Sequence, residues 1–452
     1  MTLPEDFLKN MSLVVPRKEF EAFVKALADD QQTTSIRFNR AKFSAEEAKL
    51  HFGDTAQVGW CEEGLYLDHR PQFTLDPLLH AGAYYVQEAS SMFVSHVIRH
   101  LVDQPVFCLD LCAAPGGKTT AAISALPQGS QLVSNEIDRR RARILAENIT
   151  KWGSPDVTVT SNAPKDFKPL RHVFNLVITD VPCSGEGMFR KDEGAVADWS
   201  LTKVKECATL QHSIINDIWD CLKPGGLLIY STCTFNVDED EHMVDYICQE
   251  LGGMALEVPV AEEWNIHKPL IGNAPCYRFM PHFTKGEGLF MAVIRKDEGK
   301  SLPCKAMKAT KYKRSKEILN NWVNAEVVLE QNKNGVITAI PLNHVPLHDA
   351  VANSGLFVLQ SGVELGKVKG KDIIPSHNLA LSNILSKEAF PNVEVSFDVA
   401  LDYLRRMAIV LPPDSPTGYV LLTYRGLPIG FVKNLGSRCN NIYPQEWRIR
   451  NL

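Results

Sequence analysis

Cys183 and Cys233 are the residues of this chain whose type and setting best fit covalent chemistry. Each follows an apolar, strand-like run, the first in the motif Asp-Val-Pro-Cys-Ser-Gly and the second in Tyr-Ser-Thr-Cys-Thr. Small and hydroxyl neighbours favour partial exposure and thiolate formation. Because ligands of open parallel sheets gather at the carboxyl ends of the strands, the two thiols are predicted to share one substrate pocket.

The remaining cysteines are expected to be chemically silent. The chain has 11 cysteines, with no Cys-x-x-Cys pair and no Cys/His cluster at zinc-ligand spacing, so neither disulfides nor a metal site are expected. An isolated cysteine in apolar surroundings is usually an inert core residue. This interpretation applies to Cys61, Cys108, Cys207, Cys221, Cys248 and Cys276.

A turn of small residues upstream has the character of a cofactor loop, because small side chains let the backbone approach a ligand closely. Glu136 ends the next predicted strand, where an acidic side chain typically accepts hydrogen bonds from ribose hydroxyls. The spacing fits neither the dinucleotide nor the nucleoside-triphosphate motif, so an adenosine-type cofactor is predicted, with a tight structural turn as the alternative. The turn comprises Cys112, Ala113, Ala114, Pro115, Gly116, Gly117 and Lys118.

Two further polar residues follow strands of the same predicted sheet. Asn162 comes after the third strand, and its amide can both donate to and accept from an adenine edge; capping a helix is the alternative role. Asp180 ends the fourth strand, directly before the Pro-Cys pair. A carboxylate at that position is expected to be buried or nearly so, and to have a functional role.

The pattern of predicted helices and strands changes along the chain, and the order of these elements indicates an α/β protein. The first hundred residues or so read as a small α+β unit, with a helix around Phe20 to Leu27 and short strands at 35–39, 58–60 and 65–67. Short apolar strands then alternate with helices, as in βαβ units. The Pro-Gly-Gly turn at 224–226 is expected to separate a helix ending at Leu222 from the next strand. The core strands are predicted at 106–111, 131–135, 157–160, 173–179, 226–230 and 289–294.

Composition is that of an ordinary globular protein. The 452 residues are 45% hydrophobic and 22% charged, with a formal net charge of -5. No apolar run approaches the roughly 18 residues needed to span a membrane, and no secretory signal precedes the fold, so a cytoplasmic protein is expected. One densely basic segment stands out as a phosphate-binding or simply solvated linker. It contains Lys305, Lys308, Lys311, Lys313, Arg314 and Lys316.

Together these motifs resemble those of the RNA cytosine-C5 methyltransferases that use S-adenosylmethionine. The likeness is strongest from Ala81 to Lys296 and includes the Gln-Glu-Ala-Ser-Ser segment at 87–91. The Arg-Lys-Asp at 190–192 and C-terminal segments 430–434 and 443–447 look like the bacterial RsmF type, which modifies 16S ribosomal RNA. The resemblance implies a Rossmann-like methyltransferase core with a small N-terminal α+β domain and C-terminal α+β and PUA-like β-rich domains.

The resemblance also implies domain limits and partners. It divides the chain into an N-terminal RNA-binding domain (1–90), a methyltransferase domain (91–298), a linker with a first C-terminal domain (299–385) and a PUA-like domain (386–452). RNA is the expected partner, most of all 16S ribosomal RNA within the small subunit, and a monomer would suffice. Basic residues on the last domain are expected to form a phosphate-binding face or a solvated surface. They are Lys433, Arg438, Arg448 and Arg450.

The implied chemistry assigns different roles to the two thiols. The Cys233 thiolate adds to C6 of cytosine and makes C5 nucleophilic, while Cys183 assists release of the product. Asp180 is similar to the aspartate that contacts N3 and the exocyclic amine of the base. Lys118 matches a motif lysine at the cofactor edge, although a plain surface lysine remains an alternative. By resemblance the cofactor is held by residues 112–118 with Glu136, Asn162 and Asp180, although many relatives carry Asp in place of Asn162.

Three other functions compete with methylation of ribosomal RNA. The catalytic motifs are compatible with the same chemistry on transfer RNA, and only the accessory segments favour the ribosome. A non-catalytic RNA-binding assembly factor is disfavoured because the chain retains both Cys183 and Cys233. A DNA cytosine methyltransferase would attack with the cysteine of its Pro-Cys motif and would not need the second one.

Overall fold

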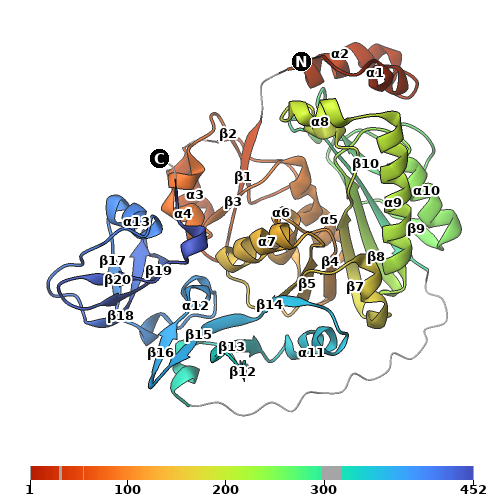
Figure 1. Ribbon diagram of the computed structural model, residues 1–452. Coiled ribbons are helices and arrows are strands. Elements are labelled where there is room, and N and C mark those ends of the chain that lie inside the picture. Colours follow the sequence, from red (N-terminus) through yellow and green to blue (C-terminus); the bar gives the residue numbers. More distant parts are fainter. Residues whose placement is uncertain (1, 30–32, 54, 298–316, 451–452) are drawn as a thin grey trace.

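Four β-sheets organise the part of the chain that the structure describes (Figure 1). The structure, a computed structural model, describes residues 2–29, 33–53, 55–297 and 317–450. The predicted basic segment from Lys305 to Lys316 lies outside these residues. In the described part, a nine-stranded sheet carries the two cysteine motifs, and sheets of three, four and four strands lie around it.

The large sheet has a parallel centre in the order β6-β5-β4-β7-β8, continued by antiparallel β11 and β10. The strand order reverses at β4, so a crevice is expected beyond the carboxyl ends of β4 and β7. All six predicted core strands are present. The strands are β4 (Phe107–Asp110), β5 (Gln131–Asn135), β6 (Val157–Thr160), β7 (Phe174–Asp180), β8 (Leu222–Thr232), β9 (Gly253–Ala255), β10 (Tyr277–Phe279) and β11 (Leu289–Lys296).

One predicted boundary is wrong. The helix before β8 ends at Trp219, and the strand begins at Leu222, ahead of the Pro-Gly-Gly turn. Leu222 already pairs with Phe174, and the register then shifts so that Leu227 pairs with Leu176. The turn is therefore an irregularity inside the strand, where Gly225 has a φ of 73° that a residue with a side chain rarely adopts.

Helices cover both faces of the large sheet. Alternation along β7 directs Leu176 and Ile178 into one core and Val177 into the other. The first face is covered by α5 (Phe93–Leu101), α6 (Gly117–Ala125) and α7 (Arg139–Trp152). The second is covered by α9 (Leu201–Trp219), α10 (Glu241–Glu250) and α11 (Val345–Asn353).

A segment from the C-terminal third completes this core. Strand β14 (Val358–Ser361) pairs antiparallel with β6 at the sheet edge, and Leu347 and Val351 of α11 pack into the second core. The predicted 299–385 domain limits stay a prediction, but these two elements belong to the central core. The neighbouring antiparallel sheet contains β12 (Val327–Gln331), β13 (Val336–Pro341), β15 (Val363–Lys369) and β16 (Asp372–Pro375).

The N-terminal region packs against the cysteine loops. The Phe7 ring lies 5.2 Å from that of Phe189, and the Phe23 ring lies 5.3 Å from that of Phe235. No strand forms at the predicted 58–60, where Gln57 makes only a single bridge to Leu65. The N-terminal elements are α1 (Glu5–Met11), α2 (Arg17–Ala28), β1 (Thr34–Phe38), α3 (Ala45–Phe52), β2 (Gly64–Leu67), α4 (Pro77–His80) and β3 (Tyr84–Val86). The loop after Cys183 contains α8 (Glu193–Asp198).

The last sheet packs against the N-terminal region near α4 (Figure 1). The ring of His377 lies 5.0 Å from that of Tyr443, whose hydroxyl is 3.3 Å from His80. A two-residue turn, Arg425 and Gly426, joins the two longest strands of this sheet. The elements are α12 (His377–Leu381), β17 (Asn392–Glu394), α13 (Phe397–Leu404), β18 (Gly418–Tyr424), β19 (Leu427–Asn434) and β20 (Cys439–Asn441).

Short 3-10 helices connect many of these elements, and none of the helices in the described residues is long and apolar enough to cross a membrane. The 3-10 helices are η1 (Phe73–Leu75), η2 (Ser90–Met92), η3 (Pro164–Leu170), η4 (Glu186–Met188), η5 (Glu262–Trp264), η6 (Glu317–Trp322), η7 (Lys387–Ala389) and η8 (Gln445–Trp447).

Candidate active site

The two predicted reactive cysteines meet. Strands β7 and β8 are parallel neighbours whose ends are in register at Asp180 and Ser231, so the loops that follow them leave the sheet side by side. The Sγ atoms of Cys183 and Cys233 are 3.3 Å apart, and both residues are partly exposed. A single substrate can therefore be reached by either thiol.

The surroundings of the two thiols differ in charge. The hydrogen bond to Cys233 and then burial raise the pKa of Cys183 well above its ordinary value, and the nearby Glu239 carboxylate acts in the same direction. Cys233 instead lies within electrostatic reach of the Lys118 ammonium. The two sulfurs lie within hydrogen-bonding distance, and either thiol can act as the donor.

Lys118 and Asp180 form an ion pair beside the thiols. The Lys118 Nζ lies 2.9 Å from Asp180 Oδ2, and Ser231 Oγ donates to Asp180 Oδ1 at 2.8 Å. Burial by itself lowers the pKa of Lys118, but the Asp180 carboxylate reverses this and raises it overall. The lysine side chain is 12% exposed, so it is not a plain surface lysine. The Asp180 side chain is 38% exposed, and our expectation of a buried carboxylate was wrong because its strand end opens toward the thiol edge.

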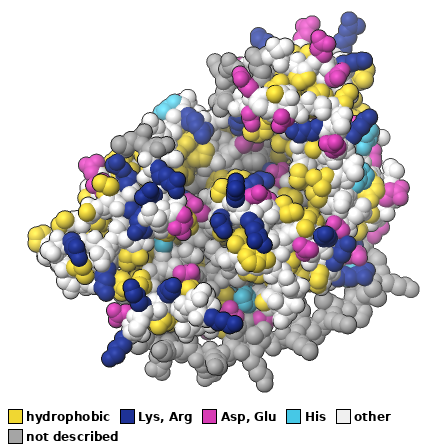
Figure 2. Space-filling view, in the orientation of Figure 1, with side chains coloured by type: hydrophobic (Ala, Val, Ile, Leu, Met, Phe, Trp, Pro, Cys, Tyr) yellow, Lys and Arg dark blue, Asp and Glu magenta, His cyan; other side chains and the backbone are white. Residues whose placement is uncertain are grey.

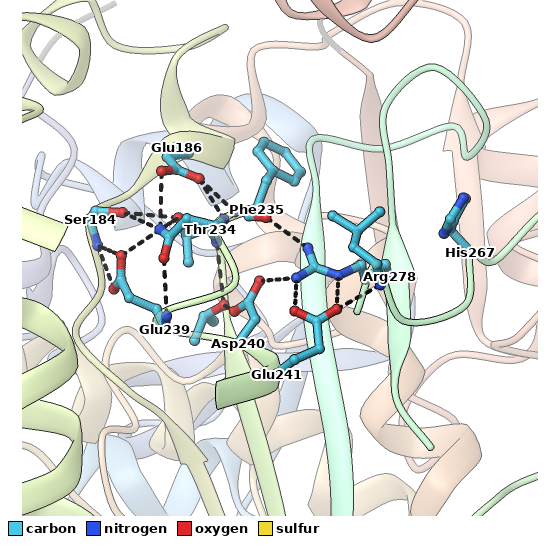
Figure 3. Close-up of polar contacts among 12 residues, drawn as sticks. Ser184, Glu186, Thr234, Phe235, Glu239, Asp240, Glu241, His267 and Arg278 are labelled. Carbon is cyan, nitrogen blue, oxygen red and sulfur yellow. Dashed lines mark hydrogen bonds and ion pairs between the residues drawn. The ribbon is translucent and has the colours of Figure 1, made fainter. Parts of the chain in front are cut away.

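A buried polar network holds the two cysteine loops together (Figure 3). The Ser184 hydroxyl is 2.9 Å from that of Thr234, which joins the residues directly after the two cysteines. The Asn236 side-chain amide donates to both hydroxyls and to the carboxylates of Glu186 and Glu239. Glu186 accepts the backbone N–H of Asn236, and Glu239 accepts that of Ser184. Because every contact is buried, the loops are held in one arrangement.

A second buried cluster supports the loop after Cys233. Figure 3 shows Asp240 and Glu241 facing the guanidinium of Arg278 on β10. The Arg278 Nη1 also donates to the carbonyl of Phe235 at 3.0 Å, and the Thr232 hydroxyl donates to Asp240 at 2.6 Å. The loop is therefore anchored to the antiparallel half of the sheet as well as to the Cys183 loop.

The small-residue turn lies where the cofactor prediction requires it, between β4 and α6. Gly116 directly precedes the helix with a φ of 114°, and a side chain there would press on Leu145 at 3.2 Å. Cys112 is held by the Thr179 hydroxyl, and burial raises its pKa to about 12. At the base of the turn, burial raises the pKa of Asp110 to about 7, and within the described residues its Oδ1 has no hydrogen-bond partner. The turn lets a ligand approach its backbone closely, and Asp110 Oδ1 is an acceptor without a partner. Both features fit a polar organic cofactor.

Glu136 and Asn162 end the two strands next to the turn. The Glu136 side chain is buried, and its carboxylate accepts from the backbone of Asp138 at 3.0 Å with acceptor capacity to spare. Asn162 exchanges two hydrogen bonds with the backbone of Phe357, donating at 3.1 Å and accepting at 2.8 Å. One N–H and one lone pair of the amide are left for a ligand, so its predicted contact with adenine stays a prediction.

Exposed arginines line the start of α7, beside the cofactor turn. Figure 2 shows Lys and Arg side chains gathered over this helix at the centre of the face in view. The four residues are Arg139, Arg140, Arg141 and Arg143. Positive charges at a helix N-terminus oppose the helix dipole. Arg141 is offset by the Glu136 carboxylate, 3.5 Å away, and donates to the Ala114 carbonyl at 2.7 Å. The triple-arginine run was the sequence signal for this face, and our sequence reading missed it.

The polar network was missed as well, although its members stand close to the cysteines in the sequence. The sequence signal was the presence of polar residues directly after both cysteine motifs. Glu186 follows the Ser-Gly pair, and Asn236 and Glu239 follow the Thr-Cys-Thr motif. By contrast, the basic residues predicted on the last domain remain unassigned. Lys433 lies within 3.9 Å of Asp372, whereas Arg438, Arg448 and Arg450 are exposed.

The other cysteines behave largely as expected. Cys61, Cys108, Cys221 and Cys276 are buried, and burial raises the pKa of Cys61 to about 11. Cys207 on α9 and Cys248 on α10 are only partly buried, so the prediction that they are core residues is wrong. Neither is among the buried residues of its helix. In the described residues every cysteine is free, and no group of three or more His, Cys, Asp or Glu side chains is arranged to hold a metal ion.

Solved structures place this architecture in one class. A methyltransferase homolog protein from Pyrococcus horikoshii matches 65% of the chain and 100% of its own, at 23% identity and a TM-score of 0.54. NSun6 from the same organism, solved with SFG, matches 65% of the chain and 98% of its own, at 18% identity and a TM-score of 0.55. The fold is therefore that of a Rossmann-like methyltransferase with additional domains, as predicted.

Family comparisons identify the branch. The profile described as 16S rRNA methyltransferase RsmB/F matches residues 101–295, the RsmF N-terminal domain matches 3–89, and the methyltransferase RsmF PUA domain matches 390–449. The chain is also 29% identical to "Ribosomal RNA small subunit methyltransferase F" of Enterobacter sp. (strain 638), over 98% of the chain and 95% of the relative. The protein of the same name from Escherichia coli is 29% identical over 98% and 96%.

The chain belongs to the RsmB/F family of 16S rRNA methyltransferases, in its RsmF branch. It is accordingly an RNA methyltransferase, and the prediction of S-adenosylmethionine as its cofactor is confirmed at the level of the family.

Proposed function

We propose that this protein methylates C5 of a cytosine in 16S ribosomal RNA through a covalent bond between Cys233 Sγ and C6 of the base. The observation that carries the proposal is the pair of thiols 3.3 Å apart at the carboxyl ends of β7 and β8. Cytosine C5 is too electron-poor to take a methyl group unaided, and addition of a thiolate at C6 supplies the missing electron density.

The neighbouring groups support this division of labour. The Lys118 ammonium stabilises negative charge on the Cys233 sulfur before it attacks. Asp180, held by Lys118 and Ser231, presents a carboxylate that accepts from the exocyclic amine of the base. S-adenosylmethionine, when bound, supplies the electrophilic methyl group.

Release returns the enzyme to its starting state. Once C5 carries the methyl group, a water molecule takes the C5 proton, the electrons of the C5–H bond reform the C5–C6 double bond, and the bond between C6 and sulfur breaks. Cys233 leaves as a thiolate, and the Cys183 thiol stabilises that charge by donating a hydrogen bond to it. The same hydrogen bond stabilises the thiolate that begins the cycle, so Cys183 contributes to both steps without attacking the base itself.

Different residues bind the cofactor and the RNA. The turn at 112–118, Glu136, Asn162 and the edge near Asp180 are the residues that would hold the cofactor. The α7 arginines lie beside this site and fit the phosphates of the RNA strand that carries the target cytosine. Because a paired base is out of reach, the target must be single-stranded or flipped out of its helix.

A trapping experiment tests the mechanism. RNA transcribed with 5-fluorocytidine carries no C5 proton, so methylation should stop at the protein–RNA adduct, seen as a slower band in denaturing electrophoresis. Wild type and Cys248→Ala should form the adduct, whereas Cys233→Ala should not. An adduct that persists in Cys233→Ala would refute the nucleophile assignment.

Bisulfite sequencing identifies the substrate. Total RNA from a strain lacking the protein should lose one or more 5-methylcytosine signals in 16S ribosomal RNA, and the wild-type gene should restore them. Loss of a signal in transfer RNA instead would favour the alternative substrate. Unchanged RNA on both counts would favour a non-catalytic assembly factor. Purified 16S RNA and isolated small subunits, methylated in parallel, would show which form is recognised.

A further inference from the structure

Two large apolar side chains stand exposed at the cofactor end of the sheet. Ile137, which directly follows Glu136, is 62% exposed, and Phe357 is 49% exposed. Ser161 contacts the backbone of both, donating through its hydroxyl to the Ile137 carbonyl at 3.4 Å and through its N–H to the Phe357 carbonyl at 3.1 Å. Neighbouring exposed apolar side chains are typical of a ligand surface.

The Phe357 backbone is held tightly although its ring is open. The two hydrogen bonds exchanged with the Asn162 side chain fix its N–H and its carbonyl. The next residue, Val358, begins β14 and pairs with Thr160 of β6. On the ring itself, the Arg139 guanidinium lies 5.2 Å from the centroid. Because the ring is still 49% exposed, it offers a flat surface for stacking beside the arginine.

This aromatic group comes from outside the segments that define the family. Phe357 lies between the range matched by the methyltransferase profile, 101–295, and that matched by the PUA profile, 390–449. It reaches the site because β14 adds to the edge of the methyltransferase sheet next to β6.

We propose that Phe357 and Ile137 form the apolar walls of the pocket for the adenine ring of the cofactor. This inference rests on the proposed cofactor site: a ribose bound at Glu136 would carry its base toward Ile137, the next residue, and toward Phe357 and Asn162. Adenine has apolar faces and hydrogen-bonding edges. The two side chains supply contact for the faces, and the remaining N–H and lone pair of Asn162 supply contact for an edge. The C-terminal third of the chain thus takes part directly in binding the cofactor.

Calorimetric titration of the full chain with S-adenosylhomocysteine tests the proposal without any need for turnover. Loss of one base–aromatic stack should weaken binding of this ligand to Phe357→Ala by about five- to a hundredfold. Phe357→Trp should retain binding, because it keeps a stacking surface. The matched control is Phe397→Ala, which removes another half-exposed phenylalanine of the C-terminal third, 45% exposed at the start of α13. It should bind as wild type does.

A ligand without adenine separates stacking from a general loss of structure. S-ribosylhomocysteine has no adenine and so cannot stack on residue 357. It should therefore bind wild type and Phe357→Ala equally. An equal loss for both ligands would overturn the proposal, since the variant would then act through the fold.

The remaining outcomes are also decisive. Unchanged binding of S-adenosylhomocysteine to Phe357→Ala would overturn the inference while leaving the proposed function intact. If that variant instead bound RNA more weakly, Phe357 would be an RNA contact. Failure of wild type to bind S-adenosylhomocysteine at all would reject the cofactor site and this inference together.

Discussion

Ser184 and Thr234, the residues that directly follow the two reactive cysteines, hydrogen-bond to each other through their hydroxyls at 2.9 Å. This contact ties the two loops at the point where the distance between the thiols is decided. Asn236 donates to both hydroxyls, and buried Glu239 accepts from the Ser184 N–H and from Gln211 of α9. The separation of the sulfurs is therefore set by residues that need not touch the substrate.

Removing the hydroxyl of Ser184 should loosen the thiol pair. In Ser184→Ala we expect the free energy of unfolding to fall by about 1–2 kcal/mol, because a buried hydrogen-bonded group loses its partners. Methyl transfer should slow by about tenfold to a hundredfold, since small displacements of reacting groups are costly. Urea unfolding and single-turnover methylation measure the two effects.

The control is Ser200→Ala, which removes the hydroxyl that caps α9 by accepting from Lys203 at 3.1 Å. It should lose a similar free energy of unfolding, about 1 kcal/mol, but keep its rate. Equal rates in the two variants would show that the network stabilises the protein without positioning the cysteines.

Removing the Cys183 thiol should trap the reaction after methyl transfer. In Cys183→Ala the departing Cys233 sulfur loses the donor that lies 3.3 Å away. We expect a covalent protein–RNA adduct to accumulate with unmodified RNA and cofactor, visible as a shifted band in denaturing electrophoresis. Cys207→Ala, which removes a partly exposed thiol on α9, should show free RNA and normal turnover. Normal turnover in Cys183→Ala would contradict the proposed role of Cys183 in product release.

Neutralising the α7 arginines should weaken RNA binding and its dependence on salt. We choose Arg140 and Arg143, whose side chains are exposed. If each contacts one phosphate, the double glutamine variant should reduce the slope of log affinity against log salt by about 1.4 to 1.8. Filter binding or anisotropy over a salt series measures this slope.

The matched control changes the same charge elsewhere. Lys168→Gln with Arg171→Gln removes two exposed cations from the stretch just before β7, which enters the sheet at the edge opposite the thiols. The slope should stay as in wild type. A loss of affinity as large as that of the α7 variant would mean that binding depends only on total charge.

Acid should destabilise the junction between the N-terminal region and the last sheet. Burial lowers the pKa of His80 to about 4 and that of His377 to about 3, from an ordinary 6.5. The folded state therefore holds both neutral, and their contribution is complete above pH 6.5 and lost as the pH falls toward 4. Between pH 7 and pH 5 the free energy of unfolding should drop by about 2 kcal/mol for each histidine.

Trp447 reports on this junction, because its ring lies 5.2 Å from that of His377. Urea unfolding followed by tryptophan fluorescence should show a weaker pH dependence in His377→Asn, even though that variant is less stable at neutral pH. His242→Gln, which changes a histidine that is 53% exposed, should keep the wild-type dependence. An unchanged slope in His377→Asn would contradict the assignment.

Local patterns in the sequence determined much of the core. The strand of residues 131–135 and that of residues 157–160 have their predicted bounds, because alternating apolar runs between turn residues leave little choice of structure. The same patterns indicated the carboxyl-edge location of Cys183, Cys233 and Glu136. The motif resemblance supplied their order of action, which spacing alone left open.

Only the tertiary structure decided which distant residues complete the site. Nothing local in Phe357 indicates that its strand joins the sheet beside β6, or that Asn162 engages its backbone. The exposure of Asp180 and its pairing with Lys118 depend in the same way on neighbours from separate loops. Periodicity reports the environment of a residue along its own element, whereas contacts between elements arise from packing the whole chain. The sequence therefore determined the two thiols and the edge of the sheet that carries them, and the folded structure decided their separation, the charged groups beside them and the position of Phe357 next to Asn162.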